Sequence, residues 1–207
     1  MKKGKAIGPG SSSASRDQES DDDSPLFFYM PKAKYGEFCQ WHPSVFTVSK
    51  DDISQLLGRV VDEADTDGAA SITVNCAEQF MMYCKAARFG DTETQTRVLA
   101  TTSPKEQKRL GKQTAGFTDE SWDEVKSAVV EGGNMAKFAQ NPQLRRTLMA
   151  TGERQLCEAA SRDRVWGIGY AAHRAMPMRK HWGETRLGKA LMAVRERLRR
   201  EEDEAKA

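Results

Sequence analysis

The most distinctive hydrophobic pattern in the chain lies between residues 75 and 89, in the stretch NCAEQFMMYCKAARF. Residues three, four and seven apart share one face of a helix, and two such faces are largely apolar here. One face holds Ala77, Phe80, Cys84 and Ala87, and the other holds Glu78, Met81, Met82, Lys85 and Phe89. We predict a helix buried on both faces. Its two charges should then lie in or beside a cavity, because an unpaired buried charge is costly.

The rest of the chain predicts a mainly α fold with minor β structure. Short strands or extended segments are expected in SPLFFYMP and SVFTV, which are rich in aromatic and β-branched residues. A helix should begin at Ser103-Pro104 and another at Asn141-Pro142, where a capping residue precedes proline. The segment 156–159 fits either a helix or a buried strand. The pair Gly132-Gly133 should weaken or bend the helix that contains it.

The last helix is predicted from ETRLGKALMAVRERL, which has an apolar stripe formed by Leu187, Leu191, Val194 and Leu198. Before it, the segment DDISQLLGRVVDEADTDGAA reads as a polar insertion with a helical turn. Residues 1–25 contain little to bury and are expected to form a disordered polar tail. Residues 26–200 should form one compact α+β domain, followed by a charged C-terminal end at 201–207.

Composition narrows the class of protein. The 207 residues include 32 basic and 30 acidic side chains, and a net charge of +2 argues against binding to nucleic acid through bulk charge. The four cysteines and three histidines show no metal-ligand spacing, so neither a metal nor a cofactor is expected. No apolar run is long enough to span a membrane, and an intracellular location, cytoplasmic or nuclear, is expected.

Glu78 has two interpretations. Asn75 is a good N-cap residue, and a glutamate three residues later has the spacing of a capping box, in which Glu78 would accept the Asn75 amide. This interpretation leaves Lys85 unexplained. The other interpretation places both charges in a functional site.

Several further residues are awkward to explain by packing alone, namely Trp122, Asp163 and Trp166. Carboxylates close to indoles recur where a ring or sugar is bound and a glycosidic bond is polarised, although a tryptophan is more often a core residue. The basic segment HRAMPMRKHW, residues 173–182, is a candidate for binding phosphate or a nucleic-acid backbone, or else a solvated loop.

The motifs that contain these residues resemble the NADAR, or YbiA-like, family of N-glycosidases. The similarity runs from about Phe28 to Arg197 and rests on six blocks in order: YGEFCQW, AEQFMMYCKAARF, SWDEVK, MAKFAQNPQLRRTLMATG, DRVWGIG and WGETRLGKALMAVRE. The resemblance implies a single compact, mainly α domain that hydrolyses N-glycosidic bonds next to ribose phosphates. Two substrate classes are associated with such proteins: ADP-ribose attached to a base, notably guanine, and the phosphoribosylamino-pyrimidine intermediates of riboflavin synthesis.

Carried over to this sequence, the resemblance implies catalytic roles for Glu78, Lys85 and Asp163. It implies substrate-binding roles for Gly36, Glu37, Phe38, Trp122, Trp166, Gly167 and Gly169. The chain departs from the family pattern at Ile168, where some bacterial members have Asp. It departs again at Thr185, where the pattern is usually Asn-x-Leu-Gly.

We therefore expect a hydrolase of N-glycosyl bonds in which Glu78 positions or deprotonates a water. Its expected ligand is ADP-ribose or ADP-ribosylated guanine, as a nucleoside or in nucleic acid, and the riboflavin intermediate is the alternative. Two other classes stay open: a module that binds ADP-ribose without cleaving it, and a purely structural α domain.

Overall fold

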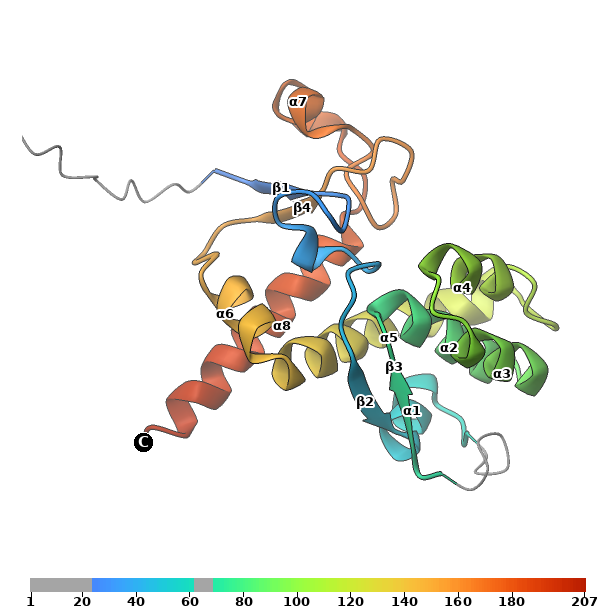
Figure 1. The fold of residues 1–207 in the computed structure, drawn as a ribbon. Coiled ribbons are helices and arrows are strands. Elements are labelled where there is room, and N and C mark those ends of the chain that lie inside the picture. Colours follow the sequence, from blue (N-terminus) through green and yellow to red (C-terminus); the bar gives the residue numbers. More distant parts are fainter. Residues whose placement is uncertain (1–23, 62–68) are drawn as a thin grey trace, which may run out of the picture.

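A computed structural model describes residues 24–61 and 69–207, and most of the predicted N-terminal tail lies outside these residues. The described part is mainly helical with four short strands, which confirms the predicted fold class (Figure 1). The helices are α1 (Lys50–Leu57), α2 (Ala77–Arg88), α3 (Thr92–Ala100), α4 (Pro104–Gly111), α5 (Asp119–Gln140), α6 (Pro142–Met149), α7 (Ala172–Ala175) and α8 (Arg186–Glu204), with 3₁₀ turns η1 (Gly36–Phe38) and η3 (Met176–His181).

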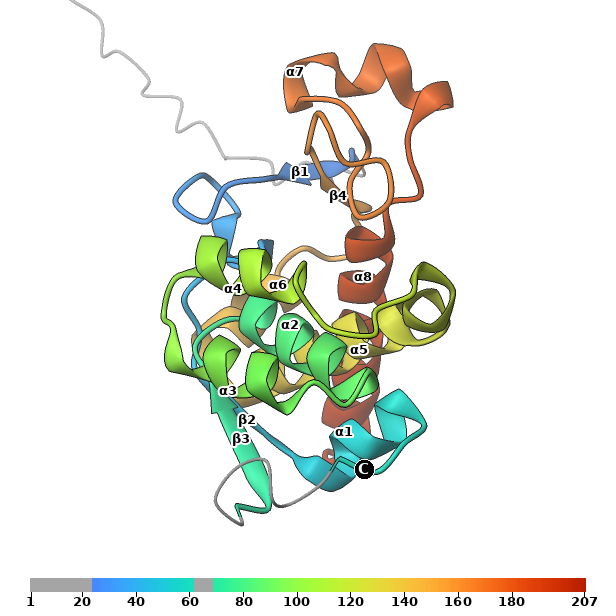
Figure 2. The same ribbon diagram turned by 90° about the vertical axis from the view of Figure 1, so that its right-hand side faces the viewer.

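The strands form two small sheets near opposite ends of the molecule (Figures 1 and 2). Strands β1 (Leu26–Phe28) and β4 (Leu156–Glu158) pair in parallel, which settles the segment at 156–159 as a strand. Strands β2 (Phe46–Ser49) and β3 (Ser71–Val74) pair antiparallel, with α1 between them in the chain. The sequence predicted β1 and β2 but missed β3, and it predicted a helical turn where α1 has eight residues.

Helix α2 is buried on both faces, as its double apolar pattern predicts. Ten of its twelve residues are buried, because α3, α4 and α5 all pack against it. Helix α8 lies against α5 and β4 through the predicted stripe, whose four residues are all at most 1% exposed. The described helices include none that is long and apolar enough to cross a membrane.

The glycine pair of α5 serves close packing. The helix runs through Gly132 and Gly133 without interruption. A Cβ atom at Gly133 would lie 2.5 Å from the ring of Phe80 on α2, and one at Gly132 would lie 2.8 Å from Leu56 on α1. The pair therefore allows α5 to approach both helices closely, which offsets the low helix propensity of glycine.

Candidate functional site

A cavity of about 520 Å³ lies where α2, α4 and the beginning of α5 meet two loop segments. One loop segment includes residues 29–31 and 39–41, and the other includes residues 158–166. Five of the predicted site residues line this cavity: Glu78, Lys85, Trp122, Asp163 and Trp166. The fold thus brings together side chains from two helices, α2 and α5, and a loop.

Glu78 does not make the capping contact that its spacing predicts. The helix begins at Ala77, and the backbone N–H of Asn75 donates to the side-chain oxygen of Gln79 at 2.7 Å. The capping interpretation of Glu78 is therefore wrong. The Gln79 amide donates in turn to the carbonyl oxygens of Val98 and Thr101, at 2.9 and 3.0 Å.

The carboxyl group of Glu78 faces the cavity with the residue only 5% exposed. Burial raises its pKa, while the charge of Lys108 and a hydrogen bond with the side chain of Trp41 act in the opposite direction. The result is a pKa above the ordinary value. Such a carboxylate binds a proton more readily than an exposed one, as a general base requires.

Trp41 reaches Glu78 because its loop is fixed at several points. The backbone N–H of Glu78 donates to the carbonyl of Gln40 at 3.0 Å, and the side-chain amide of Asn134 on α5 donates to the Gln40 side chain at 3.0 Å. The ammonium of Lys137 donates to the carbonyls of Glu37 and Cys39, at 2.7 and 3.2 Å.

Lys137 is a fully buried lysine that sequence analysis did not single out. It is 0% exposed, and burial lowers its pKa to about 8. Its hydrogen bonds tie α5 to the loop that carries Trp41. The apolar face of α5 gave no signal for this role, because the two carbonyl acceptors come from a distant part of the chain.

The predicted residues Gly36, Glu37 and Phe38 support the cavity wall without lining it. Gly36 is required for close approach, since a Cβ atom there would lie 2.3 Å from the carbonyl oxygen of Pro31. Phe38 is 0% exposed and packs edge-on against Phe28 in the core. The adjacent residues 39–41 form the wall itself.

Asp163 shapes the turn that presents Trp166. One of its carboxylate oxygens accepts the backbone N–H groups of Val165 and Trp166, at 2.9 and 2.8 Å. Gly167 lies outside the cavity lining and passes close to β4, where a Cβ atom would be 2.8 Å from the carbonyl oxygen of Glu158. Gly169 also lies outside the lining and has a φ of +80°, a conformation that favours glycine.

Glu158, the last residue of β4, is a third acidic group in the cavity, beside Glu78 and Asp163, and sequence analysis missed it. Burial raises its pKa to about 7, with smaller contributions from the like charges of Asp163 and Glu78 and an opposing one from Lys108. The available signal was a lone carboxylate in the apolar run LCEAA. The parallel pairing of β4 with β1 is what turns this residue towards the site.

Basic side chains line part of the cavity. The ammonium of Lys85 lies 3.7 Å from the centroid of the Phe117 ring. Burial lowers the pKa of Lys85, the charge of Asp119 raises it in part, and the like charge of Lys112 lowers it further. The predicted phosphate-binding segment 173–182 is instead outside the cavity lining, in α7 and η3.

The described residues contain no group of three or more histidine, cysteine, aspartate or glutamate side chains that could hold a metal ion. All four cysteines are buried and have free thiols.

The NADAR domain model matches residues 27–199, nearly the whole described part of the chain. The chain belongs to the NADAR family. The N-glycosidase R617 of Acanthamoeba polyphaga mimivirus is 39% identical over 122 residues, covering 58% of this chain and 72% of that protein. The N-glycosidase YbiA of Escherichia coli (strain K12) is 32% identical over 116 residues, covering 56% of this chain and 67% of YbiA.

The fold is shared with a solved member of this family. The NMR structure of the E. coli protein YbiA has a TM-score of 0.64 and 25% identity, covering 90% of this chain and 92% of YbiA. A riboflavin biosynthesis protein of Vibrio vulnificus (strain YJ016), VVA0006, is 26% identical over 85% of this chain and 39% of that protein. The names of R617 and YbiA agree with the predicted enzyme class, a hydrolase of N-glycosyl bonds.

Proposed function

We propose that this NADAR protein is an N-glycosidase that hydrolyses the C1′–N bond between ADP-ribose and guanine. The observation that carries the proposal is one cavity in which two carboxyl groups, the buried Glu78 and the half-buried Glu158, lie among three indoles. This combination suits a reaction that builds positive charge on a sugar ring and then needs a proton for the departing base.

Glu78 acts as the carboxylate of this pair. Burial raises its pKa, whereas the charge of Lys108 and the hydrogen bond with Trp41 favour the ionised form. As the C1′–N bond breaks, the carboxylate stabilises the developing positive charge and accepts a proton from the attacking water. Trp41 holds the carboxyl group in position.

Glu158 acts as the acid. With a pKa raised to about 7, it carries a proton in a large fraction of molecules near neutral pH. It donates that proton to the leaving base, so that the base departs neutral and not as an anion. Two carboxyl groups in different surroundings thereby take opposite roles in one reaction, a common arrangement in glycoside hydrolysis.

The remaining side chains bind the substrate. Trp122 and Trp166 supply aromatic faces against which a base or sugar ring stacks. Lys85 and Asp163 fix the ribose hydroxyls or the leaving base, with Asp163 also holding the turn of Trp166. A volume of about 520 Å³ falls in the range of nucleotide-sized ligand sites.

The choice of ADP-ribosylated guanine as substrate follows from the family resemblance and from the basic segment at 173–182. Arg174, Arg179 and Lys180 in this segment are exposed, as a contact to a nucleic-acid backbone requires. Figures 1 and 2 show α7 projecting at the end of the molecule that carries β1 and β4. A modified base in a nucleic acid therefore has an additional surface to contact.

A phosphoribosylamino-pyrimidine is the second candidate substrate. The observation that favours it is the match to VVA0006, which is named as a riboflavin biosynthesis protein and of which this chain covers 39%. The same two carboxyl groups would serve this substrate, because it also contains a C1–N bond of a ribose phosphate.

The deciding experiment is single-turnover hydrolysis of an oligonucleotide carrying ADP-ribosylated guanine, with released ADP-ribose as the readout. Wild type should release ADP-ribose and Glu78→Gln should not, since removal of a general base costs about 10²–10⁴-fold in rate. Cleavage of the phosphoribosylamino-pyrimidine alone would select the second substrate. Binding of ADP-ribose without cleavage of either substrate would make this protein a binding module. No binding at all would leave a structural domain.

A further inference from the structure

Two lysines line the cavity from α4: Lys108 lies in the helix and Lys112 directly follows its last residue. Both are exposed, and they are four residues apart in the sequence. Residues with this spacing lie one above the other on a helix, and two like charges there repel each other. In the part of the chain that the structure describes, neither ammonium group has an ion-pair partner. A bound anion would compensate two positive charges that are held close together without a partner.

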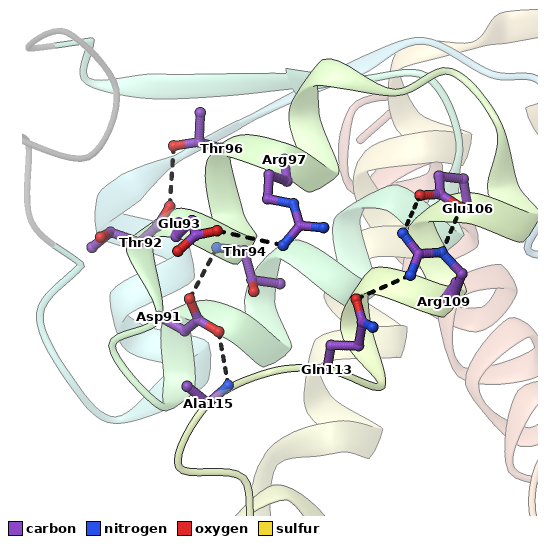
Figure 3. A network of polar contacts seen from close by, with 10 residues as sticks. All are labelled: Asp91, Thr92, Glu93, Thr94, Thr96, Arg97, Glu106, Arg109, Gln113 and Ala115. Atoms are coloured by element: carbon purple, nitrogen blue, oxygen red, sulfur yellow. Dashed lines mark hydrogen bonds and ion pairs between the residues drawn. The ribbon is translucent and has the colours of Figure 1, made fainter.

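The neighbouring basic residue of the same helix shows the contrast (Figure 3). Arg109 donates two hydrogen bonds to the carboxylate of Glu106, at 2.8 and 2.6 Å, and a third to Gln113 at 3.2 Å. The charge of Arg109, outside the cavity lining, is therefore compensated within the protein. On the cavity face, Lys108 and Lys112 have no such partner among the described residues.

Both lysines affect the pKa values of other residues that line the cavity. The charge of Lys108 opposes the rise that burial causes in the pKa values of Glu78 and Glu158. Lys112 acts on Lys85, and the repulsion between the two ammonium groups lowers the pKa of Lys85. An anion bound between Lys108 and Lys112 would offset the charge of Lys112 and so weaken its repulsion of Lys85.

We propose that Lys108 and Lys112 form an anion subsite at the α4 wall of the cavity, and that it binds a phosphate group of the substrate. A phosphate is the fitting ligand, because a lysine ammonium binds phosphate oxygens as a point charge and both lysines can contact one group. Arg162, which lines the cavity from the loop that follows β4, is an additional cation for the same or an adjoining phosphate. This inference rests on the proposed function for the identity of the substrate. It assigns the phosphate inside the cavity to α4 and leaves the segment 173–182, which lies outside the cavity lining, for a nucleic-acid backbone.

The test is calorimetric titration of the full chain with ribose 5-phosphate and with ADP-ribose. The variants are Lys108→Gln/Lys112→Gln, the charge-conserving Lys108→Arg/Lys112→Arg, and Lys105→Gln as the matched control. Lys105 is exposed on the same helix and is absent from the cavity lining. The double Gln variant should bind at least one probe about tenfold more weakly or worse, since charged hydrogen bonds to phosphate are lost. The Arg variant and the control should stay near wild type.

The two probes separate a phosphate monoester from a pyrophosphate as the bound group. Weakening of ribose 5-phosphate would assign the subsite to a terminal phosphate, and weakening of ADP-ribose alone would assign it to the pyrophosphate. Equal affinities of the double Gln variant and the Lys105→Gln control would overturn the subsite, as would the absence of binding of both probes to wild type.

Failure of the subsite and failure of the proposed function have different signatures. Hydrolysis of ADP-ribosylated guanine with the same KM in the double Gln variant as in wild type would remove the subsite and keep the function. Phosphate-dependent binding that the double Gln variant weakens, without hydrolysis by wild type, would keep the subsite and remove the function.

Discussion

Gln79 accepts the backbone N–H of Asn75 at 2.7 Å, one residue beyond the glutamate whose spacing predicts that contact. Because Gln79 closes the beginning of α2, the carboxyl group of Glu78 faces the cavity, where the side chain of Trp41 hydrogen-bonds with it. Adjacent residues of one helix thus divide two tasks, structural support and chemistry. Substituting Glu78 and Gln79 one at a time therefore tests the two roles separately.

Glu78→Gln should abolish turnover while leaving the melting temperature equal to or above that of wild type. The amide keeps the volume of the side chain and removes a carboxyl group whose pKa burial has raised. Gln79→Ala should have the opposite profile. It leaves the Asn75 amide and the carbonyls of Val98 and Thr101 without their buried partner, a loss of about 2 kcal/mol or more in the free energy of unfolding.

The measurements for this pair are single-turnover rates and urea denaturation of both variants. A Glu78→Gln protein that is clearly destabilised but still turns over substrate would return Glu78 to a structural role. The activity of Gln79→Ala should be measured below its unfolding transition, where the remaining folded protein keeps both carboxyl groups.

The hydrolysis rate should fall as pH rises through about 7, the pKa of Glu158. A general acid works only in its protonated form, and the groups that set this pKa besides burial are Asp163, Glu78 and Lys108. Glu158→Gln should reduce the rate at pH 6 by about 10²–10⁴-fold and remove this alkaline limb from the pH–rate profile. A variant that retains the limb would show that another group titrates there.

The same substitution has a consequence for stability. The pKa of Glu158 is raised in the folded protein, from 4.5 to about 7, so its stabilising contribution is complete below pH 4.5 and is lost as pH rises through 7. The Gln side chain does not titrate. The free energy of unfolding of Glu158→Gln, minus that of wild type, should therefore increase as pH rises from about 5 to about 8. Urea denaturation at these two pH values measures the difference, and an unchanged difference would contradict the raised pKa.

Lys137 should make the protein more stable as pH rises from 7 to 9. Its folded pKa is lowered from 10.5 to about 8, so the unfolded chain binds more protons than the folded one in this window. The free energy of unfolding of wild type, minus that of Lys137→Met, should rise by about 1 kcal/mol over this range. Taking the difference removes the contributions of the cysteines, and a flat difference would show that Lys137 keeps its ordinary pKa.

Thr185→Asn should stabilise the protein by about 1 kcal/mol, or about 2–4 °C in Tm. Thr185 precedes α8 with a φ of 53°, a left-handed conformation that is strained for a β-branched residue. Asparagine adopts this conformation more readily, which gives a physical reason for the usual Asn-x-Leu-Gly pattern of the family. Thr185→Ser separates the two effects, because it removes the branch without adding the amide. A lower Tm of the Asn variant would contradict the account.

Contact between the segment 173–182 and a nucleic acid predicts a substrate-dependent effect. Arg174→Glu/Lys180→Glu should lower kcat/KM for ADP-ribosylated guanine in an oligonucleotide and leave cleavage of the free nucleoside unchanged. The loss should shrink as salt is raised, since contacts to a phosphate backbone are screened. Equal effects on both substrates would assign these residues to the folded structure and not to nucleic-acid binding.

The sequence by itself determined the elements with local signals. Two apolar faces predicted the burial of α2, the leucine stripe predicted α8, and Ser103-Pro104 predicted the beginning of α4, where the Ser103 hydroxyl accepts the Glu106 amide at 3.4 Å. The NADAR motifs identified the family and five residues that line the cavity. Strand β3 escaped prediction, because its four residues follow a polar segment and alternate too briefly to register as a pattern.

Only the tertiary structure decided which side chains act together. Trp41 and Glu158 come from loops and strands far from α2 in the sequence, and no spacing rule connects them with Glu78. Their positions depend on the parallel pairing of β1 with β4 and on hydrogen bonds from α5 to the loop at 37–41. Periodicity reports which face of an element is buried, whereas a site requires knowing what that face is buried against, which depends on how distant segments pack.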